Sequence, residues 1–194
     1  AMFVCNDIKR RVRCNGIAYS DCAILYRTNY QSRTFEEQFM KNNVPYSIYG
    51  GMSFYQRKEI KDIIAYFRLV VNHDDEEAFR RIINYPARGI GDTTVRKIAV
   101  AAQTSGLSMW QVICSPLRVG LDVNKGTMAK LTAFRALIEG FSTRLDSEDA
   151  FALGHDILKL SGITQDIYSS TEPEYRARQE NVEEFMSSMQ EFVE

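Results

Sequence analysis

The sequence predicts an α/β protein with predominantly helical content, in which a parallel sheet of few strands is followed by an all-helical part. The apolar run 22–26 shows no polar alternation, which is typical of a strand buried on both faces of a parallel sheet. A helical pattern and a second short strand pattern, 45–49, follow it. A strand–helix–strand order of this length favours a right-handed crossover between parallel strands.

The composition is that of an ordinary globular protein of 194 residues, with 45% hydrophobic and 25% charged residues. The net charge of −1 excludes a basic signature over the whole chain, so a nucleic-acid contact has to come from local placement. Local basic clusters occur at 9–13 and 80–81, and solvated helix faces are the alternative interpretation of both.

The four cysteines and two histidines show no metal-ligand spacing, so we expect no metal site and reduced thiols. The sequence contains no signal peptide and no apolar run of membrane length. We therefore expect a cytoplasmic protein that does not contact a membrane.

The first elements follow one another closely. Helical spacing predicts a helix over 2–12 that stops at Asn15–Gly16. After the first strand, a second helix is predicted over 32–41, with Thr34 and Glu37 as a possible capping box. The second strand, 45–49, is closed by the glycine pair 50–51.

From Tyr55 onward the pattern is wholly helical. A stretch of weak periodicity, 115–126, predicts a domain boundary, which divides the chain into 1–118 and 119–194. The predicted helices are marked by apolar residues over 58–71, 78–83, 95–102, 128–141, 153–160 and 175–192, with a short helical turn after Ser161–Gly162.

Tyr26 and Arg27 stand at the carboxyl end of the first predicted strand, where open α/β sheets bind ligands. An aromatic ring beside a guanidinium suits a flat base and a phosphate. The alternative is that Tyr26 packs against a neighbour and Arg27 pairs with a carboxylate.

The turn Gly89–Ile90–Gly91 joins two predicted helices. Glycines let the backbone approach a partner, and the free N–H groups of the following helix favour an anion such as a DNA phosphate. Thr93 and Thr94 add hydroxyl donors. The alternative is a tight helical hairpin with Asp92 as its N-cap.

A weaker pattern of the same kind occurs at Ser161, Gly162 and Thr164, for which a plain corner between helices is the alternative. The junction 50–59 offers aromatic rings for stacking on single-stranded bases, or a scaffold corner in which Phe54 fills a core. No phosphate-binding loop of the G-x-x-x-x-G-K-[ST] type and no catalytic triad occurs, so this chain alone should not hydrolyse a nucleotide.

Several stretches together resemble the UvrD/Rep/PcrA-type DNA helicases of superfamily one. The resemblance covers nearly the whole chain in the family's order, although each motif alone is weak. It is carried by 23–33 (AILYRTNYQSR), 50–62 (GGMSFYQRKEIKD), 78–84 (AFRRIIN), 86–92 (PARGIGD) and, more loosely, 161–163 and 178–185.

The resemblance implies the first part of a RecA-like domain (2A) over 1–118, with a partial parallel sheet, and the start of its helical insertion (2B) over 119–194. It implies that Tyr26 stacks on the adenine of ATP and that Arg27 reaches the γ-phosphate as an arginine finger. ATP and Mg²⁺ would then belong to the full-length parent, an ATP-dependent 3′-to-5′ DNA translocase, because the phosphate-binding loop is not in this chain.

The same resemblance implies that Gly89, Ile90, Gly91, Thr93 and Thr94 touch the DNA backbone and that Ser161, Gly162 and Thr164 contact duplex. The partners would be single-stranded DNA, a duplex junction and the remaining helicase domains of the parent. Two other functions remain open: a stand-alone DNA-binding or protein-interaction module on this scaffold, and a structural helical adaptor without a nucleic-acid role.

Overall fold

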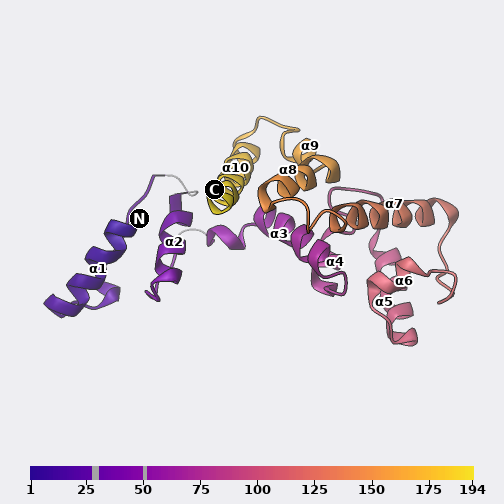
Figure 1. Cartoon of the computed structure of the whole chain (residues 1–194), viewed down its shortest axis with the longest axis horizontal. Coiled ribbons are helices and arrows are strands. Elements are labelled where there is room, and N and C mark those ends of the chain that lie inside the picture. Colours follow the sequence, from indigo (N-terminus) through magenta and orange to yellow (C-terminus); the bar gives the residue numbers. More distant parts are fainter. Residues whose placement is uncertain (28–30, 50–51) are drawn as a thin grey trace. The chain divides into compact units, whose positions relative to one another are not determined.

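The structure, a computed structural model, describes residues 1–27, 31–49 and 52–194. Throughout these ranges the regular elements are helices (Figure 1). The chain divides into two compact units, Ala1–Lys61 and Asp62–Glu194.

The first unit has a small apolar core between α1 (Met2–Asn15) and α2 (Ser32–Lys41). Cys5, Phe39 and Val44 are buried in it. The partly buried side chains that pack against this core are Ile8, Tyr19, Ile24 and Phe35. The described residues of this unit also include the 3₁₀ turns η1 (Tyr19–Asp21) and η3 (Phe54–Gln56).

A buried carboxylate holds η3 against α2. Glu36 accepts hydrogen bonds from the Phe54 N–H, at 3.0 Å, and from the Ser53 hydroxyl. Phe54 is fully buried, and the Arg57 guanidinium lies 5.2 Å from the centre of its ring. This geometry agrees with the scaffold-corner interpretation of 52–59, whereas Gly50 and Gly51 lie outside the described residues.

The predicted parallel sheet is wrong: no strand occurs among residues 1–27, 31–49 and 52–194. The backbone at Cys22 is extended (φ −105°, ψ 134°), as the apolar pattern indicates. A strand also needs a neighbouring strand that pairs with its N–H and C=O groups, and the described residues form no such strand beside 22–26 or 45–49; the Cys22 N–H instead donates to the Tyr19 carbonyl at 3.1 Å. Leu25 is therefore 97% exposed and Tyr49 93% exposed, where a central strand would bury them.

The second unit consists of packed helices. Its first helix, α3 (Lys58–Val71), begins in the first unit. Within the second unit, α5 and α6 pack together, α8, α9 and α10 form another group, and α7 contacts both α6 and α8 (Figure 1). The other bounds are α4 (Glu76–Ile82), α5 (Asp92–Ser105), α6 (Met109–Cys114), α7 (Lys125–Ser142), α8 (Ala150–Ser161), α9 (Ile163–Ile167) and α10 (Pro173–Val193).

The helix predictions for 32–41 and 58–71 are confirmed with the same bounds. The capping box at Thr34 and Glu37 is wrong, because α2 already begins at Ser32 and Glu37 pairs with Arg33 at 2.8 Å. The six-residue helix α6 was not predicted. The domain boundary between 118 and 119 stays a prediction.

Aromatic side chains form the centre of the second unit. Phe134 of α7 lies edge-on to Phe79 of α4 and to Trp110 of α6. Trp110 also stacks on His73, with ring centroids 4.4 Å apart. On α8, a Cβ atom at Gly154 would come within 2.9 Å of Phe67 and 3.0 Å of Met189, so glycine allows the close approach of α3, α8 and α10.

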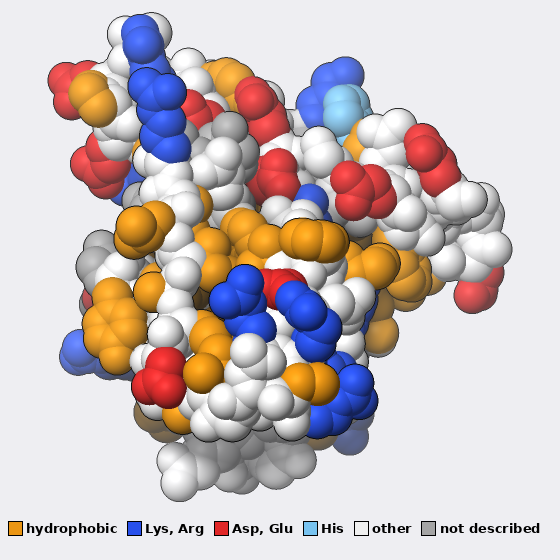
Figure 2. Space-filling model, turned by 90° about the vertical axis from the view of Figure 1, so that its left-hand side faces the viewer, with side chains coloured by type: hydrophobic (Ala, Val, Ile, Leu, Met, Phe, Trp, Pro, Cys, Tyr) orange, Lys and Arg blue, Asp and Glu red, His pale blue; other side chains and the backbone are white. Residues whose placement is uncertain are grey.

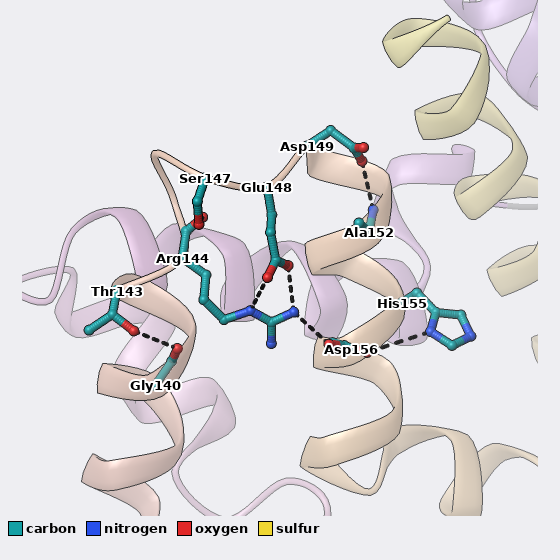
Figure 3. Close-up of polar contacts among 9 residues, drawn as sticks. All are labelled: Gly140, Thr143, Arg144, Ser147, Glu148, Asp149, Ala152, His155 and Asp156. Atoms are coloured by element: carbon teal, nitrogen blue, oxygen red, sulfur yellow. Dashed lines mark hydrogen bonds and ion pairs between the residues drawn. The ribbon is translucent and has the colours of Figure 1, made fainter.

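An ion-pair network fixes the corner between α7 and α8 (Figure 3). Arg144, just after α7, donates to Glu148 in the loop and to Asp156 on α8, at 2.6 Å. Both hydrogen bonds raise the pKa of Arg144, and the one to Glu148 has the larger effect. The hydrogen bond from Arg144 in turn lowers the pKa of Asp156. The network ties the chain just after α7 to the middle of α8 and therefore helps to fix the angle between the two helices.

Several large hydrophobic side chains of the first unit are exposed, among them Phe3, Leu25, Tyr49 and Met52. Figure 2 shows hydrophobic and basic side chains together at the surface of one face of the molecule. In the described ranges, no helix has the length and apolar character needed to cross a membrane.

Asp75 is the N-cap of α4, and its substitution tests how much this cap stabilises the fold. Its carboxylate accepts the Ala78 N–H at 2.9 Å and pairs with Arg68 at 2.8 Å. The hydrogen bond from Ala78 contributes most to lowering the pKa of Asp75, and the contacts with Arg68 lower it further. Asp75→Ala should lower the free energy of unfolding by about 1 kcal/mol, whereas Asp75→Asn keeps a capping oxygen and should lose less. Urea denaturation at pH 7 measures both.

The lowered pKa also predicts a pH dependence. The stabilisation from the Asp75 carboxylate is fully present above the ordinary carboxyl pKa, about 3.9, and is lost as the pH falls through the lower folded value. The unmodified chain should therefore lose more stability than Asp75→Asn between pH 5 and pH 2. Equal losses at acid pH, or equal effects of the two variants at pH 7, would contradict this assignment.

Candidate nucleic-acid interface

The turn between α4 and α5 is closed by one side-chain amide. The Asn84 Oδ1 atom accepts the N–H groups of Arg88 and Ile90, each at 3.0 Å. Ile90 points into the core and is 1% exposed, while Gly89 and Gly91 are exposed on either side of it. Gly89 has φ +68°, a left-handed conformation that favours glycine. The turn therefore buries its one side chain and presents backbone to solvent.

This turn leads directly into the N-terminus of α5, where Gly91 is the N-cap and offers no side-chain cap. The first N–H groups of a helix have no acceptor within the helix, and the helix dipole adds partial positive charge there. Thr93 is exposed and Thr94 is half-buried. Asp92 is the first helical residue rather than the N-cap suggested by the hairpin alternative.

The second predicted corner lies between α8 and α9. Ser161 is buried, and its hydroxyl accepts the Ile163 N–H at 3.3 Å. Gly162 is half-buried with φ +90°, and Thr164 is exposed. Of the three predicted contacts, Thr164 therefore presents an open hydroxyl, whereas the Ser161 hydroxyl is turned inward.

Arg88 joins the two corners. Its guanidinium donates to the carbonyl groups of Ile82, at 2.9 Å, and Tyr85, at 2.7 Å, beside the first corner. It also donates to the Ser161 carbonyl at 3.2 Å, which lies in the second corner. The same group bonds the Tyr66 hydroxyl and lies 5.4 Å from the centre of the Phe134 ring.

Two further contacts support this junction. The Tyr85 hydroxyl donates to Asp166 of α9 at 3.1 Å, and burial, followed by the charge of Asp166, raises the pKa of Tyr85. A Cβ atom at Gly162 would lie 3.9 Å from Pro86. The structure thus brings the predicted residues 89–94 and 161–164 into neighbouring corners of one unit.

Tyr26 and Arg27 belong to the first unit, where the structure shows no strand end to carry them. Tyr26 is half-buried, and Arg27 is exposed while its backbone N–H donates to the Gln31 side chain at 3.0 Å. An exposed guanidinium on a segment without a sheet can reach a group supplied from outside the unit. Thr28, Asn29 and Tyr30 lie outside the described residues.

The roles of two residues in this region were not predicted from the sequence. Asn84 closes the turn, and its signal was an Asn just before a Pro- and Gly-rich turn, where Asn is common. Lys130 of α7 donates to the Gly89 carbonyl at 3.0 Å. No local signal marks Lys130, because 41 residues separate it from Gly89.

The described side chains include no group of three or more His, Cys, Asp or Glu residues that could hold a metal ion. The comparisons with known proteins concern the whole chain. Residues 1–194 match the UvrD-like helicase C-terminal domain. The chain belongs to this family.

Curated relatives include the ATP-dependent DNA helicase PcrA of Staphylococcus aureus, which is 38% identical over 194 residues. The PcrA helicase of Staphylococcus epidermidis is 37% identical over the same length. Each match covers 100% of this chain and 26% of the relative. The chain therefore spans about a quarter of the length of these PcrA helicases.

Arg88 can be tested through stability. Arg88→Lys should lower the free energy of unfolding by roughly 2 kcal/mol or more. A lysine ammonium cannot donate to carbonyl groups in both corners at once, so part-buried acceptors lose their donor. Urea denaturation followed by the fluorescence of Trp110, the single tryptophan, measures this loss.

The matched control is Arg96→Lys, an exposed position on α5 that should stay within about 0.5 kcal/mol of the unmodified chain. Equal unfolding midpoints for Arg88→Lys and the unmodified chain would show that Arg88 does not hold the corners together.

Proposed function

We propose that this chain is part of an ATP-dependent 3′-to-5′ DNA helicase, to which it contributes DNA-backbone contacts and an ATP-sensing arginine. On this proposal, it is not catalytic alone. The observation that carries the proposal is the junction at Arg88, which places both predicted DNA-contacting corners in one unit of a UvrD-like chain.

The DNA contact follows from the chemistry of the turn. The open N–H groups at the start of α5 and the Thr93 hydroxyl are donors suited to phosphate oxygens. Gly89 and Gly91 carry no side chain that would keep a phosphate away from the backbone. Such contacts read the backbone rather than the bases, as a translocating protein requires. Thr164 at the second corner extends the surface toward a duplex junction.

The ATP contact concerns Tyr26 and Arg27. On this proposal the Tyr26 ring covers the adenine, and the Arg27 guanidinium meets the γ-phosphate of ATP bound with Mg²⁺ mainly by other domains of the parent. The exposure of Arg27 among the described residues supports a contact with a partner domain. The bound nucleotide supplies the phosphoanhydride that is cleaved, and Arg27 stabilises the charge that develops on it.

Gly91→Asp tests the DNA contact without harming the fold. A Cβ atom at Gly91 meets nothing within 4 Å, and its φ of −78° suits an N-cap aspartate. The new carboxylate should occupy the open N–H groups and repel phosphate. We expect forked DNA to bind roughly tenfold more weakly, or worse, at equal or higher thermal stability.

Gly91→Ala is the matched control, because it adds a Cβ atom but leaves the donors open; its affinity should stay near that of the unmodified chain. Fluorescence anisotropy over a salt series measures both, and phosphate contacts require that affinity falls as salt rises. If the chain does not bind DNA, or if its affinity does not change with salt concentration, the helical adaptor is favoured.

Arg27→Ala tests the ATP contact in the full-length helicase that carries this segment. ATP turnover should fall by about 10³-fold, the lower range of the effect of an arginine finger, with DNA affinity nearly unchanged. Arg13→Ala, an exposed arginine of α1, is the control and should leave turnover unaltered. Normal turnover in Arg27→Ala would favour the stand-alone DNA-binding module.

A further inference from the structure

We propose that Lys130 of α7 is a phosphate-binding residue of the same interface, and that α7 is therefore a third element beside the two corners. This inference rests on the proposed DNA contact and adds a phosphate-binding residue that none of the sequence motifs contains.

Lys130 reaches the glycine turn directly. Its Nζ atom donates to the Gly89 carbonyl at 3.0 Å, and the side chain is exposed. A Cβ atom at Gly89 would lie 2.5 Å from this Nζ atom, closer than real Cβ contacts come. Because this atom is the end of a flexible side chain, a Cβ atom would displace the ammonium, and the φ of +68° is what requires glycine here.

The ammonium group keeps capacity for a ligand. A lysine has three N–H donors, and the bond to Gly89 uses one of them. In the described part of the chain Lys130 forms no salt bridge, so its charge is not neutralised by a carboxylate. Lys97 of α5 differs, because Asp122 meets its Nζ atom with a carboxylate oxygen at 3.1 Å and a carbonyl oxygen at 2.7 Å.

The position of the charge favours an anion. Three residues after Gly89 the chain enters α5, whose N-terminus carries partial positive charge from the helix dipole. Asp92 places a carboxylate in the first turn of α5 and offsets part of this charge, so the Lys130 ammonium adds positive charge that can attract a phosphate to this end. The Lys130 ammonium, the open N–H groups of α5 and the Thr93 hydroxyl then form one donor set for a phosphodiester oxygen.

The competing role for Lys130 is structural, namely to satisfy the Gly89 carbonyl. Lys130→Arg, Lys130→Gln and Lys130→Ala separate the two roles. Arginine keeps the charge, glutamine keeps an N–H donor without charge, and alanine removes both. The position is exposed, so each variant should unfold at a urea concentration close to that of the unmodified chain.

We expect Lys130→Gln and Lys130→Ala to bind forked DNA about three- to tenfold more weakly at ~0.1 M salt. The slope of log affinity against log salt should fall by about one in both. Lys130→Arg should keep the slope of the unmodified chain. Lys41→Gln, at an exposed lysine of α2, is the matched control and should leave affinity and slope near those of the unmodified chain.

The outcomes are distinguishable. If the unmodified chain binds DNA, Gly91→Asp does not, and Lys130→Gln keeps the full salt slope, then Lys130 only caps the turn and this inference is overturned. A loss of slope in Lys130→Arg as large as in Lys130→Gln would also overturn it. If the unmodified chain shows no salt-dependent binding, the proposed function and this inference are both rejected.

Discussion

The second unit depends on a guanidinium that is half removed from water and surrounded by carbonyl oxygens. Arg88 has five N–H donors in a rigid plane, and it bonds acceptors from the end of α4, the following turn and the end of α8. The Phe134 and Tyr66 rings lie near the same group. A neutral side chain of this size could not satisfy so many acceptors, so a change here affects several helices together.

This constraint decides which groups remain for a ligand. The side chains of Ile90 and Ile163 and the Ser161 hydroxyl face inward, where they support the corners. Backbone N–H groups, glycines and threonine hydroxyls are left at the surface. The core fixes the positions of these donors, so little conformational entropy is lost when they meet a phosphate. A surface of this kind binds a repeating backbone and does not select a sequence.

The sequence predicted local structure well where an apolar pattern with helical spacing extends over several turns. The helices 32–41 and 58–71 match because each presents a regular apolar stripe. The six residues of α6 are too short for a stripe, although Ser108 and Gln111 form a capping box. The sheet was wrong because an apolar run shows a tendency to be buried but not the presence of a neighbouring strand. Likewise, no local pattern shows that Arg88 meets Ser161 or that Lys130 meets Gly89, since these pairs join distant parts of the chain.

The two units differ in how far their own residues support a functional group. The turn 84–91 is held by Asn84, by Arg88 and by the burial of Ile90 in a large aromatic and aliphatic core. Arg27 instead follows the exposed Leu25 and lies in a unit whose buried apolar cluster is centred on Cys5, Phe39 and Val44. A phosphate-binding surface can therefore be preorganised within the second unit, whereas an arginine that acts on ATP needs a further domain to fix its direction. On the proposed function, the second unit would supply a preorganised DNA contact by itself, whereas Arg27 would need a further domain before it could act on ATP.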